Sequence, residues 1–443
     1  TGRILEVGGS GIYPVDMILS CSISGLTRTD PFPAPFVTMS FDLETSIANN
    51  WILCAAAVID RAGERTEYRF RVDDESVGET DILEGLTDLV RKEDPDFITG
   101  YNIDNFDLPR IEERADAIAP RTKMDRVAML GWGRVPLIED EARQRRLFPS
   151  RQQNRVWQIA GRIPLDAWWQ ARQTLRPQRE SLRYVSRLLW GEEEGMQKMD
   201  IDASKMDEEW EARPEEVLEY CVRDAALPLD ILGKMKSIAR KEALASVSLT
   251  TVETASNSTT SRWIDSLVIR LADREGIAVP TTNTGPRKRD QIAGGYVHEV
   301  ESGMEPWVVV LDFKSMYPSI MISNNICSTT LVRDGSEEVT HSVSPSSGTR
   351  YLSKDERVGL VPRLLEDLMT SRDRHKAALI KAREEGDEAE AFLQDQLQYA
   401  VKILMNSFYG VFASSFYRFT HPDLGASITE WARHNIKNII GTL

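Results

Sequence analysis

The sequence predicts a multidomain α/β protein, and three observations support this fold class. The 443 residues are enough for about two to four domains, each with its own core. Residues 37–44 alternate in the manner of a strand, which places Asp42 and Glu44 together on one face. Two long helical patterns, at 364–383 and 389–408, are joined by a short Glu-Glu-Gly-Asp turn and therefore predict an antiparallel helical hairpin.

Composition excludes a membrane-spanning protein, because no apolar run approaches the roughly 20 residues that a span needs. The formal net charge of −15 argues by itself against nucleic-acid binding. Net charge is a poor guide, however, because metal-holding carboxylates count against the total and basic grooves are local. The cysteines are scattered, lack metal-ligand spacing and are predicted to be buried thiols of a reducing compartment: Cys21, Cys54, Cys221 and Cys327.

A local excess of arginine lies between Arg121 and Arg162, interleaved with glutamine and few acids. This segment has two possible interpretations: a solvated loop, or a hairpin that contacts a phosphate backbone. Its other arginines are Arg143, Arg145, Arg146, Arg151 and Arg155.

Three segments offer carboxylates in patterns that suit metal chemistry. Side by side on a strand, Asp42 and Glu44 repel each other, so they favour a cation between them. Asp107 lies in the segment 101–109, after a predicted strand end and glycine turn. Tyr220 and Asp224, at i and i+4 of a helical pattern that Pro228 is expected to end or kink, share one face. Taken singly, Asp107 also fits a helix N-cap and Asp224 a surface acid.

In sequence order these segments resemble the Exo I, Exo II and Exo III motifs of DnaQ-type 3′→5′ exonucleases, DxE, NxxxFD and YxxxD. The resemblance implies an RNase H-like fold, in which a mixed sheet is flanked by helices. It implies that Asp42, Glu44, Asp107 and Asp224 hold two Mg²⁺ or Mn²⁺ ions about 4 Å apart. It also implies that Tyr220 positions the attacking water. No role is assigned to Asp104 or Asp166.

A second candidate site begins at residues 312–320, Asp-Phe-Lys-Ser-Met-Tyr-Pro-Ser-Ile. They follow the apolar run Val308–Leu311, which predicts a buried strand, and Pro318 is expected to help set the turn after it. A carboxylate at such a strand end suits a hard cation, although an Asp there is more often a cap. The nonapeptide resembles motif A of the family B DNA polymerases, DFxSLYPSI. The resemblance implies that Asp312 and Phe313 bind the catalytic metal ions and that Tyr317 excludes a 2′-hydroxyl.

Residues 402–410 resemble motif B of the same family, KxxxNSxYG. Arg372 and Lys376, at i and i+4 of the first helix of the hairpin, lie where the first fingers helix of the family carries its triphosphate ligands. The resemblance implies that these two residues, with Lys402 and Asn406 of motif B, converge on a dNTP triphosphate, where they neutralise charge. It places Tyr409 and Gly410 against the nascent base pair. Taken alone, either pair of charged or amide residues also fits a helix face that is simply exposed to solvent. Met405 stands where alanine is frequent in the family. Together with Arg418-Phe419 and Ser427-Ile428-Thr429, it makes the sequence resemble the bacterial polymerase II branch or its archaeal relatives.

The segment 291–297 resembles the YxGG region of the family, which implies template contact by Gly294, Gly295 and Tyr296. No segment after Gly410 resembles the family's motif C, YGDTDS. We therefore expect that motif C and the thumb are supplied by a second polypeptide, as in split archaeal family B enzymes; a fragment is the alternative.

The predicted function is DNA-dependent DNA synthesis with 3′→5′ proofreading, with primer–template DNA, dNTPs and a sliding clamp as partners and no membrane. The expected location is the cytoplasm, near the nucleoid of an archaeon or bacterium. A nuclease with a vestigial polymerase half and a non-catalytic scaffold are the alternatives. The predicted domains are an N-terminal remnant and linker (1–36), the RNase H-like exonuclease (37–231), a helical connection (232–300), a partial palm (301–361), helical-hairpin fingers (362–410) and a truncated palm helix (411–443).

Overall fold

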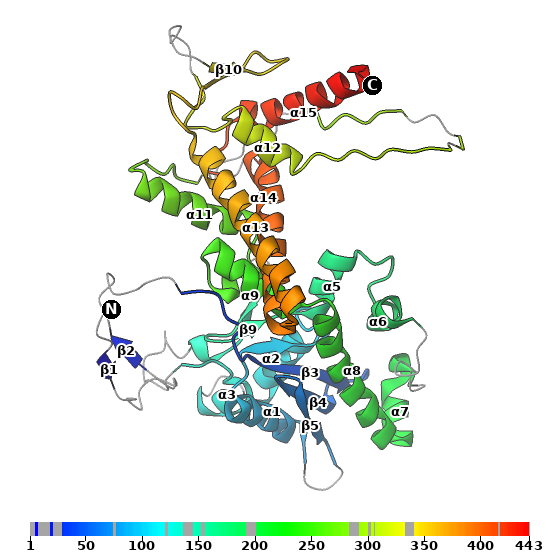
Figure 1. The fold of residues 1–443 in the computed structure, drawn as a ribbon. Coiled ribbons are helices and arrows are strands. Elements are labelled where there is room, and N and C mark those ends of the chain that lie inside the picture. The colour runs from blue at the N-terminus through cyan, green and yellow to red at the C-terminus, as the bar shows by residue number, and fades with distance from the viewer. Residues whose placement is uncertain are drawn as a thin grey trace. The chain divides into compact units, whose positions relative to one another are not determined.

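The computed structural model forms two compact units, Thr1–Ile238 and Ala239–Leu443 (Figure 1). Each unit has buried hydrophobic clusters of its own. The structure describes residues 5–7, 18–20, 29–73, 77–119, 123–135, 145–151, 156–191, 201–282, 292–299, 303–304, 306–332, 341–414 and 417–442.

The first unit contains a five-stranded mixed sheet with the strand order β5-β4-β3-β6-β9. The central strand β3 (Val37–Thr45) pairs antiparallel with β4 (Ile52–Arg61), which pairs antiparallel with β5 (Glu64–Arg71). On the other side of β3 lie β6 (Phe97–Thr99) and β9 (Ile163–Pro164), both parallel to their neighbours. The mixed sheet agrees with the fold that the resemblance implied.

Helices cover both faces of this sheet (Figure 1). Successive side chains of β4 alternate between them, as the period of a strand requires. Cys54, Ala56 and Val58 join a buried cluster with α8 (Pro214–Lys234), and the intervening residues join a cluster with α1 (Glu79–Glu93). The helix α8 does not end at Pro228, which is buried within it; packing on the sheet outweighs one lost backbone hydrogen bond.

The first unit has further helices: α2 (Asp107–Ile118) and α3 (Lys123–Leu130), which pack with α1; α5 (Ala167–Leu175), α6 (Leu182–Trp190) and α7 (Met206–Ala212), which pack with α8; and the start of α9 (Ser237–Ser248). Single 3₁₀ turns span Arg145–Leu147 and Ala203–Lys205. The first unit also contains two short antiparallel strand pairs. One joins β1 (Leu5–Val7) with β2 (Ile18–Ser20), and the other joins β7 (Ser150–Arg151) with β8 (Trp157–Gln158).

Arg162 is a buried side chain that links several loops of this unit. Its side chain is 4% exposed, donates to the carbonyls of Trp132 and Pro95 at 2.7 Å each, and pairs with Asp94 at 2.8 Å. Burial lowers the pKa of its guanidinium. Arg162 is therefore neither part of a solvated loop nor placed to contact a phosphate, because its side chain is buried and bonded inside the protein.

Replacing Arg162 with alanine is expected to lower the free energy of unfolding by about 2–4 kcal/mol, because it leaves the buried carbonyls of Trp132 and Pro95 without a donor. Urea unfolding followed by circular dichroism measures the change. Lys205→Ala is the control: Lys205 is exposed and lies 3.9 Å from Glu208, so its removal is expected to cost less than about 1 kcal/mol. Equal stabilities of the two variants would contradict the assigned role.

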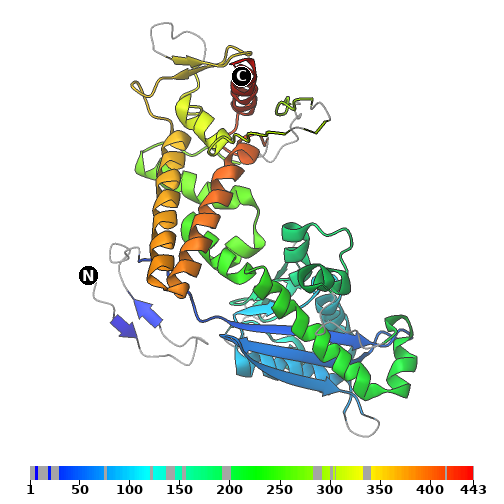
Figure 2. The same ribbon diagram turned by 45° about the vertical axis from the view of Figure 1, so that its right-hand side comes forward.

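The second unit is organised around the antiparallel pair α13 (Leu360–Glu385) and α14 (Glu388–Phe412) (Figures 1 and 2). The predicted helical hairpin is confirmed, and each helix extends beyond the range predicted from its periodicity. Gly386 ends α13 at φ 74°, a conformation that glycine adopts without strain. Asp387 caps α14 by accepting from the N–H of Glu390 at 2.9 Å.

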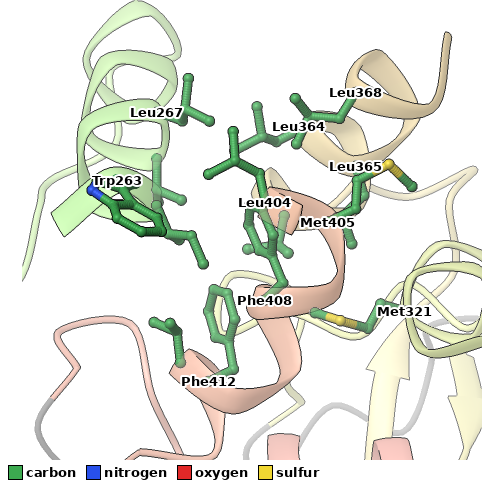
Figure 3. Close-up of a cluster of buried hydrophobic side chains, with 14 of the residues drawn as sticks. Trp263, Leu267, Met321, Leu364, Leu365, Leu368, Leu404, Met405, Phe408 and Phe412 are labelled. Atoms are coloured by element: carbon green, nitrogen blue, oxygen red, sulfur yellow. The ribbon is translucent and has the colours of Figure 1, made fainter. Parts of the chain in front are cut away.

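Apolar side chains of these helices form the core of the second unit (Figure 3). Leu404, Met405, Phe408 and Phe412 of α14 lie between α13 and α11 (Thr260–Arg274). The further elements are α10 (Val252–Asn257), α12 (Met316–Ser323), α15 (Pro422–Thr442), and the antiparallel hairpin of β10 (His341–Val343) and β11 (Arg350–Leu352).

Two predictions around residue 312 are wrong. Val308–Leu311 is no strand and is not buried; its side chains are 72–84% exposed. A β-ladder needs a partner, and none of the described strands pairs with this run. Pro318 lies in the first turn of α12 instead of setting a loop, a position where its missing N–H costs nothing.

In the described residues, no helix is long and apolar enough to cross a bilayer. Cys54, Cys221 and Cys327 are buried free thiols, as predicted. The predictions for Cys21, Arg121, Arg143, Arg155 and Gln291 lie outside the described residues.

Candidate active sites

The acidic residues of β3 face α8, as their spacing predicted. Met39, Phe41 and Leu43 point into the core on the α1 side, so Asp42 and Glu44 lie on the opposite face. There the Cys221 thiol of α8 donates to the carbonyl oxygen of Asp42 at 3.4 Å. Both acidic side chains are half-buried.

A tight turn after β6 brings Asp107 to the same place. Gly100 starts this turn, and a Cβ there would lie 2.5 Å from the carbonyl oxygen of Phe41 and 2.4 Å from Ile103. Only glycine fits such a close approach. Asp107 is the first residue of α2, after the N-cap Phe106, and it is 1% exposed. The N-cap alternative for Asp107 is therefore wrong.

The helix α8 supplies Tyr220 and Asp224, whose side chains hydrogen-bond to each other. Burial first, and then the charge of Asp224, raises the pKa of the Tyr220 hydroxyl. Tyr220 is therefore a neutral phenol at physiological pH. The structure thus brings together all five residues predicted from the three separate segments.

The four carboxylates repel one another. Burial raises the pKa of Asp42 well above its usual range, and Asp107, Glu44 and Asp224 add to the effect. Burial, followed by the charges of Asp224 and Asp107, raises the pKa of Glu44 to about 8. Burial, followed by the charge of Asp166, raises the pKa of Asp107 to about 8. Asp107 Oδ1 is buried without a hydrogen-bond partner among the described residues.

Carboxylates crowded together in this way suit a divalent cation, whose preferred ligands are carboxylate oxygens. In the part of the chain that the structure describes, no three acidic, histidine or cysteine side chains form a ready-made metal cage. The donor set nevertheless fits a divalent cation by its chemistry.

Asp166 is a residue of this site that sequence reasoning left without a role. It caps α5 and accepts from the backbone N–H groups of Asn102 and Trp168 at 2.9 Å and of Asp104 at 3.1 Å. It thereby fixes the turn that leads to Asp107. Burial raises the pKa of Asp166 to about 6, and burial followed by the charge of Asp166 raises that of Asp104 to about 7. An Asp directly before a helical pattern is the sequence signal for this cap.

The Arg-rich segment approaches the same turn. Arg151 of β7 donates to the side chain of Asn105 at 3.3 Å, and the indole N–H of Trp157 on β8 donates to the carbonyl of Asp104 at 2.9 Å. Arg145 and Arg146 are exposed. Two alternatives, solvated surface and phosphate contact, stay open for these exposed arginines.

In the second unit, residues of the two predicted polymerase motifs meet. The rings of Tyr317 on α12 and Tyr409 on α14 stack with centroids 4.6 Å apart. Lys402, Asn406 and Gly410 are exposed and, at i, i+4 and i+8 of α14, share one face.

The remaining predicted residues are also accessible. On α13, Arg372 is half-buried and Lys376 exposed, and Asp312 and Phe313 are exposed as well. Lys314 pairs with Asp373 of α13 at 3.1 Å, so the segment after Asp312 contacts the first helix of the hairpin.

The segment 292–299 is held by α15. Arg433 donates to the carbonyls of Ala293 at 3.0 Å and Gly294 at 2.7 Å. Lys437 lies 5.2 Å from the ring centroid of Tyr296. A Cβ on Gly295 would lie 3.7 Å from the Tyr317 hydroxyl, so this segment borders the tyrosine stack.

Two family models match the chain in the order of its units. Residues 15–185 match the exonuclease domain of DNA polymerase family B, and residues 250–442 match DNA polymerase family B itself. The chain belongs to DNA polymerase family B.

Curated family B relatives come from eukaryotes and archaea. The DNA polymerase delta catalytic subunit of Caenorhabditis elegans is 29% identical over 97% of this chain and 38% of its own length. DNA polymerase 1 of Pyrococcus abyssi is 30% identical over 81% of this chain and 44% of its own length. The chain spans less than half of these relatives, which do not favour an archaeal or bacterial origin over a eukaryotic one.

Among solved structures, the family B DNA polymerase of the archaeon Pyrobaculum calidifontis matches with a TM-score of 0.76 and 22% identity. The match covers 100% of this chain and 55% of that one. It shows that the two units have the family B fold, as the RNase H-like exonuclease and helical-hairpin predictions required.

Proposed function

We propose that this chain carries the 3′→5′ proofreading exonuclease and part of the polymerase site of a DNA-dependent DNA polymerase. The observation that supports it best is the cluster of Asp42, Glu44, Asp107 and Asp224, brought together from three distant segments of one unit. Mutual repulsion in a half-buried site destabilises the fold, so such a cluster is best explained by a cation that it binds.

In the exonuclease, Asp42, Glu44, Asp107 and Asp224 would hold two Mg²⁺ or Mn²⁺ ions. When bound, such ions lower the pKa of water and stabilise the oxygens of an in-line displacement. Tyr220, neutral and hydrogen-bonded to Asp224, can orient a water by hydrogen bonding but does not act as a base. Asp166 keeps Asp107 in place through the turn that it anchors.

In the polymerase site, Arg372, Lys376, Lys402 and Asn406 would bind the dNTP triphosphate, and Asp312 with Phe313 would bind metal. Positively charged donors stabilise charge on the leaving pyrophosphate. Tyr317, supported by Tyr409 at 4.6 Å, would select the sugar. Template contact would come from Gly294, Gly295, Tyr296 and Gly410.

The proposal also includes motif C and a thumb, supplied from outside these 443 residues, and a sliding clamp and primer–template DNA as partners. Two-metal phosphoryl transfer needs carboxylates on both sides of the ions, and Asp312 is the one acid assigned to the site. The proposed location is the cytoplasm, near the nucleoid of an archaeon or bacterium.

The purified chain is therefore expected to shorten single-stranded 3′ ends but not to extend a primer. Gel analysis of a labelled primer–template with dNTPs and Mg²⁺ measures both activities. Adding polypeptides that carry a DTD motif, one at a time, should restore extension. Template-directed extension by the chain alone would contradict the proposal, and extension that no addition restores would favour a nuclease or a scaffold.

A further inference from the structure

The segment 292–299 of the second unit forms neither helix nor strand, so its backbone polar groups need partners other than a helix or a sheet. It lies along α15 on either side of its two glycines. A Cβ on Gly425 of α15 would lie 2.7 Å from Cδ1 of Ile292, which shows a close approach before the glycines. After them, Lys437 lies 5.2 Å from the ring centroid of Tyr296.

Between these contacts, Arg433 fixes the direction of two successive peptide groups. Its Nη1 donates to the carbonyl oxygens of Ala293 at 3.0 Å and Gly294 at 2.7 Å. In a trans peptide the C=O and N–H groups point in opposite directions, so the N–H groups of Gly294 and Gly295 point away from Arg433. Both glycines are exposed, and in the described part of the chain neither N–H has a hydrogen-bond partner.

The surroundings of these two N–H groups suit an anion. A Cβ on Gly294 would have no heavy atom within 4 Å, so a ligand can approach the backbone there. Among the described residues, no carboxylate pairs with Arg433. Glu430, one turn earlier on α15, instead accepts from the N–H and the hydroxyl of Ser347 at 3.0 Å each. Lys437, one turn later, is exposed and adds a second positive charge. Successive N–H groups beside cations form an anion-binding arrangement.

We propose that Arg433 is a positioning residue for the template strand. By holding two carbonyls, it turns the N–H groups of Gly294 and Gly295 toward a phosphate oxygen of that strand. The inference rests on the proposed polymerase function, which assigns template contact to this segment, and it adds the residue that decides which way the backbone faces. A phosphate contact carries no sequence information, as an enzyme that copies any template requires.

The test compares Arg433→Ala with Lys437→Ala, which removes the same charge one turn away without freeing a backbone carbonyl. Binding of a labelled primer–template duplex to the 443-residue chain is measured in EDTA by fluorescence anisotropy. Arg433→Ala is expected to raise the Kd about 10- to 100-fold, the scale of a lost hydrogen bond to a charged group. Lys437→Ala is expected to raise it less than about 5-fold, the scale of one exposed charge. Arg433→Lys should restore most of the affinity, because an ammonium can also donate to two carbonyls.

Neutral methylphosphonates, placed at one template phosphate at a time, separate peptide orientation from a general structural defect. In wild type, one phosphate or two adjacent ones should be sensitive, with a Kd that rises about 10-fold or more on neutralisation. In Arg433→Ala this sensitivity is expected to fall below about 2-fold, while that of the other template phosphates is unchanged. A loosened fold would weaken all of these contacts alike.

An unchanged Kd in Arg433→Ala, or the same sensitive phosphates in this variant as in wild type, would overturn the inference and leave the proposed polymerase function intact. Failure of the wild type to bind the primer–template would contradict that function, and the inference with it. Because EDTA prevents both hydrolysis and extension, the binding result does not depend on either activity.

Discussion

Replacing both Asp42 and Glu44 with alanine is expected to abolish Mg²⁺- or Mn²⁺-dependent degradation of single-stranded 3′ ends. The two side chains share one face of β3 beside Asp107 and Asp224, so the variant loses half of the carboxylates that would hold the ions. The expected loss of rate is more than about three orders of magnitude, the scale seen when members of one catalytic group are removed. Single-turnover assays on a labelled single strand measure it.

A matched control removes the same charge elsewhere. Glu208 and Glu211 are both exposed on α7, and Glu208→Ala with Glu211→Ala should leave the nuclease rate unchanged. Degradation by the Asp42/Glu44 double variant at the wild-type rate would show that the cluster is not the active site. An inactive wild type would instead favour the scaffold alternative.

Stability gives an independent check on the double variant. The folded-state pKa values of Asp42 and Glu44 are raised, that of Glu44 to about 8, so the folded protein binds more protons than the unfolded chain between pH 4.5 and 8. The two acids therefore cost stability as the pH rises through this window. In EDTA the double variant should be more stable than wild type at pH 8, with the difference vanishing near pH 4.5.

Local periodicity was enough to predict the parts of the fold that depend on one segment. The alternation around Phe41 put Asp42 and Glu44 on one face, and the helical patterns gave the hairpin that Gly386 and Asp387 close. Each of these features is decided within about one turn or one strand of sequence.

Features that depend on distant partners were not predictable. The run Val308–Leu311 has the composition of a buried strand, but burial needs a neighbouring strand, and no described strand pairs with it. Asp166 has its role because three backbone N–H groups, two of them more than 60 residues away, converge on it. Trp168 lines a cavity beside the acidic cluster only because Asp166 starts α5 beside the turn at Asn102.

Replacing Tyr317 with alanine or valine, in enzyme that is competent to polymerise, is expected to raise ribonucleotide incorporation relative to dNTP use by about 100-fold or more. Selectivity of this kind comes from a clash with the wrong substrate, and removing the ring removes the clash with a 2′-hydroxyl. Tyr409 supports this ring by stacking on it with centroids 4.6 Å apart. Single-nucleotide insertion opposite a defined template base gives the two kcat/KM values.

Tyr317→Phe is the matched variant for this experiment. It keeps the ring and the stack on Tyr409 and loses only the hydroxyl, so sugar discrimination should stay close to that of wild type. An unchanged rNTP/dNTP ratio in Tyr317→Ala would mean that Tyr317 is only a packed aromatic of the core. A large loss of discrimination in Tyr317→Phe would assign the selection to the hydroxyl beside Gly295 instead of the ring.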